Sequence, residues 1–505
     1  MQQVGSAVRF VRRAVLVAAV AVLVIAPQLH NSSPARAIAG PTLPTNDLET
    51  MLSLASSQLA KMDTPVLAPA PPLTATPPAD CKTGSPLAGL QGRMTRADLN
   101  SPQAARGWTC NLAEVAHYSA PGGFRVWRYT DPHGHTCAYY DTSFVTPANL
   151  ISVAGGPSLG VEVLDVTRPA HPVHTATLTT LAMLAPHESL NLNTKRGLLA
   201  AEVGNGLTLP GTFSVYDVRH DCRHPQLLSQ LAVPTGHESG FSPDGRTFWA
   251  AGGFGYISAI DLTDPRHPKT IWRGAYYSHG LSLSADGKTL YQTDPINGNL
   301  GILDVSQVQD RVAHPSVHDI SRITWNPVSV PQNTVPFTSH GQHYLLEFDE
   351  FAFRFNPVTV NDAPGAARII NIDNPRRPRI TSNLRLAVQL RRNHMQADSD
   401  PSELPNQMLG YSMHYCAIPK MVNPQIAACS AINSGLRVFN IADPAHPREV
   451  AYFVSPPRAG ARPNLSPGDI AFSQPAFDPA RREIYYTDAA SGFYVLRLSA
   501  AAWPR

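Results

Sequence analysis

The sequence predicts an all-β fold, a seven-bladed β-propeller that is closed by a strand from its N-terminal side. Three observations predict it: a strand pattern that occurs seven times, hairpin turns ahead of several copies, and an unpartnered strand ahead of the first copy. A sheet of three or four strands cannot bury both of its faces alone, whereas seven such sheets packed around an axis can.

The repeated strand has a small residue, an apolar alternation and, in most copies, a final Asp or Asn. Alternation of this kind marks a half-buried strand, and Gly160 to Asp165 is the first example. The seven copies occupy residues 160–165, 213–217, 256–261, 300–304, 367–371, 436–440 and 493–497. Most copies lead into a turn with two prolines, such as Asp264 to Pro268, which ends the strand because proline fixes φ and lacks an N–H.

Hairpin turns and the unpartnered strand ahead of the first copy indicate how the ring closes. Asp244 and Gly245 form a typical tight turn between two apolar runs, because glycine accepts the positive φ that such turns demand. The last copy ends near Leu498 without a fourth strand, while residues 111–118 form a strand with no copy of its own. We therefore expect the strand 111–118 to complete the seventh blade and remove an exposed sheet edge.

The strand that ends in Asp or Asn, followed by the two-proline turn, resembles the LVIVD-repeat β-propellers of exported bacterial proteins. The resemblance covers roughly residues 111–498 of this chain. It implies the architecture and says little about activity, since function lies in sites added to a fold.

The first residues read as a targeting signal. A basic head with Arg9, Arg12 and Arg13 precedes an apolar run from Ala14 to Ala26, which is too short to span a bilayer but suits a signal-peptide core. We therefore expect a signal peptide (1–37), a proline-rich linker with a short helix at 47–62 (38–80), an N-terminal arm (81–110), the propeller (111–498) and a C-terminal tail (499–505). This organisation predicts a secreted or extracytoplasmic protein with no membrane span after cleavage.

The net charge limits the classes of partner, and the cysteine content bears on the cellular compartment. The net charge of the 505-residue chain is only +3 and its Lys and Arg are scattered, so we exclude a nucleic-acid partner. We expect a monomer, and the sequence does not say whether its partner is a protein, a glycan or a small molecule. Six cysteines in an exported chain predict disulfides. Cys416 with Cys429, across one expected hairpin, is the favoured pair, Cys81 with Cys110 is the second, and the pairing of Cys137 and Cys222 stays open.

Four histidines hold one equivalent position, just ahead of the innermost strand of their blades. They are His187, His237, His279 and His414 when the hairpins are aligned without gaps. Innermost strands line the channel, so these imidazoles can meet near the axis, and neutral imidazole suits copper, iron or zinc. Glu188 and Glu238 directly follow two of them, and metal-bound imidazoles commonly give their other N–H to a carboxylate.

The remaining blades carry other residue types at the same position. We expect these to line the axis: Trp127, Gln332 or Asn333, and Ser473 or Gln474. A separate acidic run, Glu347, Asp349 and Glu350, could bind a cation, but we expect it to face solvent or the channel.

Two functions are compatible with this sequence, and no catalytic residue can be assigned. The first is an exported metal-centred propeller with the four histidines as ligands, acting as an oxidoreductase. Four histidines around a metal on a propeller axis are also the arrangement of carotenoid-cleaving dioxygenases, an architectural analogy without a shared motif. The second is a non-catalytic cell-envelope scaffold without a cofactor, whose long inserts at 312–331, 351–364 and 384–411 bind a protein or a glycan. In that case the histidines are turn residues or hydrogen-bonding groups between blades.

Overall fold

The computed structural model describes residues 64–142, 160–204, 211–233, 236–253, 255–350, 365–394, 410–457 and 470–503. The expected signal peptide (1–37), the expected helix at 47–62 and the insert at 351–364 lie outside the described residues.

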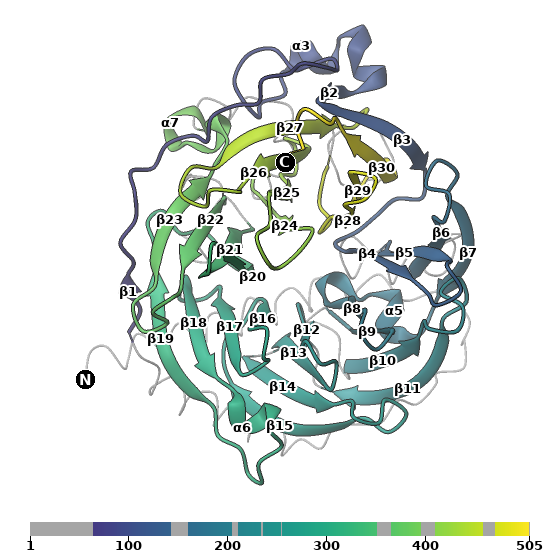
Figure 1. Ribbon diagram of the computed structural model, residues 1–505, viewed down its shortest axis with the longest axis vertical. Coiled ribbons are helices and arrows are strands. Elements are labelled where there is room, and N and C mark those ends of the chain that lie inside the picture. The colour runs from purple at the N-terminus through teal and green to yellow at the C-terminus, as the bar shows by residue number, and fades with distance from the viewer. Residues whose placement is uncertain are drawn as a thin grey trace, which may run out of the picture. The chain divides into compact units, whose positions relative to one another are not determined.

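Seven sheets stand in a ring around a common axis (Figure 1), which confirms the seven-bladed propeller. Blade one is β4 (Val126–Thr130), β5 (Thr136–Asp141), β6 (Val161–Asp165) and β7 (Val173–Leu178). Blade two is β8 (Asn191–Asn193), β9 (Leu198–Glu202), β10 (Gly211–Asp217) and β11 (Gln226–Val233). Blade three is β12 (Gly240–Phe241), β13 (Thr247–Gly253), β14 (Tyr256–Asp261) and β15 (Lys269–Ala275).

The next three blades follow the same plan, with the first strand innermost. Blade four is β16 (Leu281–Leu283), β17 (Thr289–Asp294), β18 (Asn299–Asp304) and β19 (His318–Thr324). Blade five is β20 (Pro331–Ser339), β21 (Gln342–Asp349), β22 (Ala367–Asn371) and β23 (Arg379–Leu384). Blade six is β24 (Tyr415–Ala417), β25 (Ile426–Ser430), β26 (Leu436–Asn440) and β27 (Arg448–Val454).

Blade seven joins the two ends of the ring. It contains β28 (Ala476–Asp478), β29 (Glu483–Asp488), β30 (Gly492–Leu498) and, as its outer strand, β3 (Leu112–Tyr118). β3 pairs antiparallel with β30, with Leu112 opposite Leu498 and Tyr118 opposite Phe493. The predicted closure by the strand 111–118 is therefore confirmed.

The seven repeated segments of the sequence form the third strand of every blade, namely β6, β10, β14, β18, β22, β26 and β30. The register between the third and the fourth strand shifts by one residue in each of these seven sheets. β3 carries this bulge as well, between Glu114 and Ala116. It is thus equivalent to a fourth strand in detail as well as in position.

Apolar side chains on facing sheets hold the blades together. Val438 and Ala428 of blade six belong to the same buried cluster as Ile484 and Tyr494 of blade seven. Because each sheet has a neighbour on both sides, both of its faces are buried, as the repeat requires.

The chain ahead of the ring runs along its outer edge (Figure 1). β1 (Val66–Leu67) adds to blade four by parallel pairing with β19, and β2 (Trp108–Cys110) adds to blade six by pairing with β27. Between them the backbone N–H of Thr76 donates to the carbonyl of Arg385, 2.7 Å away. The described part of the proline-rich segment is extended, as its composition suggests, and it is hydrogen-bonded to blades four and five.

Helices are short in the described ranges. They are α3 (Arg96–Leu99), η2 (Pro102–Arg106), α5 (Leu181–Leu184), η3 (His187–Ser189), α6 (Ser306–Gln309), η4 (Ala387–Gln389) and α7 (Arg391–His394). Among the described residues, no helix is long and apolar enough to cross a membrane.

All six cysteines lie in the described part of the chain and form three disulfides. Cys416 and Cys429 face each other across β24 and β25, and Cys81 ties the segment ahead of α3 to Cys110 in β2. Cys137 of β5 pairs with Cys222, which follows β10, so this disulfide links blade one to blade two.

Candidate metal centre

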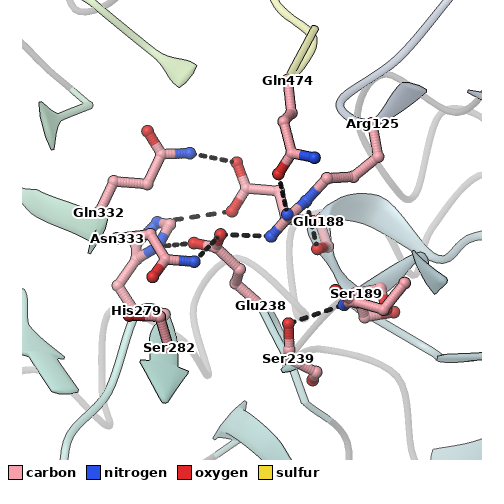
Figure 2. Close-up of polar contacts among 12 residues, drawn as sticks. Arg125, Glu188, Ser189, Glu238, Ser239, His279, Ser282, Gln332, Asn333 and Gln474 are labelled. Atoms are coloured by element: carbon pink, nitrogen blue, oxygen red, sulfur yellow. Dashed lines mark hydrogen bonds and ion pairs between the residues drawn. The ribbon is translucent and has the colours of Figure 1, made fainter. Parts of the chain in front are cut away.

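Every blade contributes residues to the axis of the ring. These residues lie just ahead of, or at the start of, the innermost strand of their blade, and Figure 2 shows part of the group. In chain order they are Arg125 of blade one, His187 and Glu188 of blade two, His237 and Glu238 of blade three, His279 of blade four, Gln332 and Asn333 of blade five, His414 of blade six and Gln474 of blade seven. Glu350, directly after β21, joins them. We call His187, Glu188, His237, Glu238, His279, Glu350 and His414 the axial cluster.

The repeat geometry explains why three of the histidines arrive at the same place. The backbone N–H of His279 donates to the carbonyl of Thr293 on the second strand of its blade, at 2.9 Å. His414 makes the same bond to Ser430 at 2.9 Å, and His237 makes it to Ala251. Each histidine therefore continues the pairing of its inner hairpin ahead of the innermost strand and points its side chain toward the axis.

The Nδ1 atoms of these three histidines lie against groups that can only accept a hydrogen bond. The Nδ1 of His237 lies 3.0 Å from the carbonyl oxygen of Gly204, and the Nδ1 of His414 lies 2.8 Å from that of Phe472. The Nδ1 of His279 lies 3.4 Å from Oε2 of Glu238. Each Nδ1 therefore carries a proton, so each ring in its neutral form would turn its Nε2 lone pair to the centre of the site.

The Nε2 atoms converge on one another and on two carboxylates. Those of His237 and His279 lie 3.2 Å apart. Oε2 of Glu188 lies 3.1 Å from Nε2 of His237, and Oε1 of the same carboxylate lies 3.1 Å from Nε2 of His414. Oε2 of Glu350 lies 2.8 Å from Nε2 of His279. Since neutral Nε2 atoms and carboxylates are all acceptors, this arrangement needs positive charge between them, from protons or from a cation.

The pKa values of these groups also indicate that positive charge is needed between them. Burial acts to lower the pKa of His279, but attraction to Glu350 and Glu188 raises it well above its ordinary value. Burial is likewise outweighed at His414, where hydrogen bonds to Glu188 and Glu350 raise the pKa to about 9. Burial acts to raise the pKa of Glu350, but attraction to His279 lowers it to about 2. Without a metal the cluster would hold charged imidazoles beside charged carboxylates.

His187 stands apart from the other three histidines. It lies in η3 with a positive φ of 50°, because blade two enters its inner strand by a tight turn. Its ring stacks on Phe124 at 4.0 Å, and its Nδ1 lies 3.8 Å from Oε2 of Glu188. Burial and the neighbouring His237 lower its pKa to about 3, which keeps the ring neutral. The side chains of His187 and His237 are 17% and 27% exposed, whereas that of His414 is fully buried, so the cluster opens on the His187 side.

Glu238 is held as a carboxylate from three sides. Its Oε1 accepts hydrogen bonds from the guanidinium of Arg125 and from the amide of Asn333, while its Oε2 faces His279. Arg125 also donates to the carbonyl oxygen of Glu188 at 3.0 Å and to the amide oxygen of Gln474. Gly280 permits the approach of Glu238, because a Cβ at that position would lie 2.3 Å from its Oε2.

The two glutamates that the sequence predicts behind the histidines take different positions. The structure places Glu188 among the Nε2 atoms, whereas Glu238 lies behind His279, where a supporting carboxylate belongs. Glu350 belongs to the cluster, but its neighbours Glu347 and Asp349 do not face solvent; they are buried against Arg368. Arg125 was not anticipated.

The other expected axis residues fall in different places. Gln332, Asn333 and Gln474 contact the cluster or Arg125. The indole N–H of Trp127 donates to the carbonyl of Leu190 at 2.7 Å, so this side chain lies between blades one and two. Ser473 is buried and accepts a hydrogen bond from the backbone N–H of Thr487.

No protein-family model matches this chain, and no curated protein matches it in sequence. Its function must therefore be argued from the axial cluster itself.

Proposed function

We propose that this protein is an exported β-propeller of the LVIVD-repeat type that binds a transition metal at the axial cluster and acts as an oxidoreductase. The observation that carries the proposal is the 3.2 Å separation of the Nε2 atoms of His237 and His279. Both Nδ1 atoms face acceptors, so in their neutral forms the two rings would present Nε2 lone pairs to each other across that distance. A metal ion between them would turn this repulsion into two bonds.

The donor set suits copper, iron or zinc. Imidazole nitrogens come from His187, His237, His279 and His414, and carboxylate oxygens come from Glu188 and Glu350. Such nitrogen and oxygen ligands favour these metals over magnesium or calcium, which prefer oxygen alone. Bound copper or iron would supply one-electron redox chemistry at this position.

The surrounding residues prepare the site for a metal. Glu238 fixes the ring of His279 through Nδ1, as carboxylates behind metal-bound imidazoles commonly do. Arg125 pairs with Glu238 and holds it in place. Phe124 covers one flank of His187 and His414, with ring centroids 4.0 and 5.5 Å away, and limits the access of water to the partly exposed side.

Export is supported by the sequence and by the disulfides. The basic and apolar N-terminal residues have the pattern of a signal peptide. Three disulfides and no free cysteine among the described residues are typical of an oxidising compartment. The repeated strand with its two-proline turn supports the LVIVD type.

One observation favours a second function, a non-catalytic envelope scaffold that binds a protein or a glycan. Protonated His279 and His414 can each donate to Glu350 and Glu188, so the cluster is also consistent with a buried, metal-free ionic network. In that case the network would join the blades and the inserts would carry the binding.

Metal analysis of the protein purified from the exported fraction separates the two functions. We expect the wild-type protein and the variant His267→Ala to retain copper, iron or zinc, since His267 is an exposed turn residue. The variants His237→Ala and His279→Ala should each bind less of it. A folded wild-type protein that carries no metal, and takes up none of the three when they are supplied, would contradict the proposal and favour the scaffold.

A further inference from the structure

Two carboxylates of the axial cluster divide their oxygens between two groups of histidines. Oε1 of Glu188 and Oε1 of Glu350 lie 3.1 and 3.4 Å from Nε2 of His414. Oε2 of Glu188 lies 3.1 Å from Nε2 of His237, and Oε2 of Glu350 lies 2.8 Å from Nε2 of His279. Each carboxylate therefore turns one oxygen to His414 and the other to the pair His237 and His279.

These distances can be compared with those expected around a metal ion. Bonds of about 2.0–2.1 Å place neighbouring ligand atoms about 2.9–3.4 Å apart in octahedral or tetrahedral geometry. The His414 side matches this range with its two oxygens. On the other side, Nε2 of His237 lies 3.2 Å from Nε2 of His279 and 3.1 Å from Oε2 of Glu188, both within this range, while the 3.7 Å from His279 to Oε2 of Glu188 exceeds it. Each side therefore has the spacing of a separate coordination sphere.

Several buried polar atoms point to an occupant. Among the described residues, Oε2 of Glu188, Nδ1 of His187 and Oε1 of Gln332 are buried and take part in no hydrogen bond. Buried polar atoms are nearly always satisfied, so three in one cluster suggest ligand atoms without their ion. Nδ1 of His187 faces the His237 side. The amide of Gln332 faces the other side, with its Nε2 3.4 Å from Nε2 of His414; Figure 2 shows this amide beside Glu188.

We infer that the axial cluster binds two metal ions bridged by Glu188 and Glu350. This inference rests on the proposed metal site. It goes beyond that site by giving the number of metal ions, the ligands of each ion and the carboxylates that bridge them. One ion takes His414 and Oε1 of both carboxylates, with the amide oxygen of Gln332 after rotation of its amide. The other takes His237, His279 and Oε2 of both carboxylates, with His187 beside it. Two ions that share ligands in this way lie about 3.5–4 Å apart.

The ligand set and the charge limit what the pair can bind. Mixed imidazole and carboxylate bridging suits divalent iron, manganese or zinc. Two divalent ions bring four positive charges against the two negative charges of Glu188 and Glu350, because Glu238 is already paired with Arg125. The remaining charge calls for an anionic ligand, such as hydroxide or a carboxylate, which would enter from the exposed side at His187 and His237.

The metal content per chain tests the inference directly. The full-length exported protein is loaded with manganese or zinc, dialysed, and analysed for metal and for protein by amino-acid analysis. We expect two ions per chain, and in the manganese form an EPR signal of a coupled pair. One ion per chain, with the EPR signal of isolated manganese, would overturn the two-ion inference and leave the proposed metal function intact. No ion, either in this experiment or after loading with copper or iron, would overturn both.

Two variants check the assignment of ligands. His414→Ala and His279→Ala should each lower the content from two ions to one, because each removes a ligand of a different ion. His343→Ala is the matched control, since this exposed histidine pairs with Asp373 far from the axis, and it should keep two. Circular dichroism identifies any variant that fails to fold. If His414→Ala folds and still binds two ions, the assignment of His414 to one of them is wrong.

Discussion

Arg125 of blade one and Glu238 of blade three form a buried ion pair at the axis, where both side chains are almost inaccessible to solvent. Arg125 directs three nitrogens to three different partners, which are Glu238, Gln474 and the carbonyl of Glu188. The pair thus connects blades one, two, three and seven and sets the position of the carboxylate that faces His279.

Removing Arg125 should damage both stability and metal binding. Arg125→Met leaves Glu238 as an uncompensated buried charge, which costs about 3–5 kcal/mol of unfolding free energy. Because Glu238 would no longer be held against His279, the affinity for metal should fall about 10–100-fold. Urea denaturation and metal titration measure the two effects. The double variant Arg125→Met, Glu238→Gln should be more stable than Arg125→Met alone, and a double variant of equal or lower stability would contradict this account of the pair.

Gly280 offers a finer test of the contact between Glu238 and His279. In Gly280→Ala the new Cβ would lie 2.3 Å from Oε2 of Glu238 and 2.5 Å from the carbonyl of Gln332, so the carboxylate must move. We expect metal affinity to fall at least tenfold with a modest loss of stability. Gly240→Ala is the matched control, because its Cβ would meet its nearest atom at an ordinary 3.4 Å. Equal affinities for the two variants, measured by titration, would show that Glu238 does not position His279.

Closure by β3 should govern the stability of the whole ring. Deletion of residues 111–118 exposes the edge of β30 and removes one strand of blade seven, so we expect a large drop in melting temperature. Deletion of residues 64–71 removes an equal length that carries only the two-residue β1 on the outside of blade four, and should cost much less. Thermal unfolding followed by circular dichroism compares them. An unchanged melting temperature in the first variant would refute strand closure.

Glu202 should make the stability of the protein depend on pH. One substitution at this position is enough to measure its contribution. Burial raises its pKa to about 8, although a hydrogen bond from Ser239 opposes the shift. Between its unfolded value of about 4.3 and about 8 the folded protein holds a proton that the unfolded chain has lost, so this group lowers stability as pH rises. The slope is at most about 1.4 kcal/mol per pH unit.

Glu202→Gln removes this term while it keeps an oxygen for Ser239. The melting temperature of the variant relative to that of the wild type should therefore be higher at pH 8 than at pH 5. Thermal unfolding at both pH values measures this difference. A difference that stays constant, or that falls with pH, would show that Glu202 is ionised in the folded protein.

The sequence predicts the ring and four of its axial residues because both follow from the repeat. Gly160 to Asp165 recurs as a third strand, and equivalent positions in a repeat stand at equivalent heights around the axis. His237, His279 and His414 therefore share a backbone hydrogen bond to the second strand of their blades. His187 departs from this rule, since it lies in η3 with a positive φ.

The roles of Glu350 and Arg125 and the pairing of Cys137 with Cys222 could not be predicted from the repeat, because they depend on contacts between blades. Glu350 reaches the axis from the end of a second strand, a position at which the other blades provide no comparable residue in this cluster among the described residues. Arg125 precedes β4 by one residue, and only its proximity to Glu238, 113 positions away in the chain, reveals its role. Cys137 and Cys222 are likewise joined by the packing of neighbouring blades.

Anomalous X-ray diffraction from crystals of the purified protein tests the central claim, that the axial cluster binds metal, most directly. The data are collected on both sides of the absorption edge of the metal identified in the purified protein. We predict anomalous density at the axis, about 2.0–2.1 Å from the Nε2 atoms of His237 and His279. Absence of anomalous density there, with Nε2 of His279 hydrogen-bonded directly to Glu350, would contradict the metal site and leave a proton-filled ionic network at the centre of the ring.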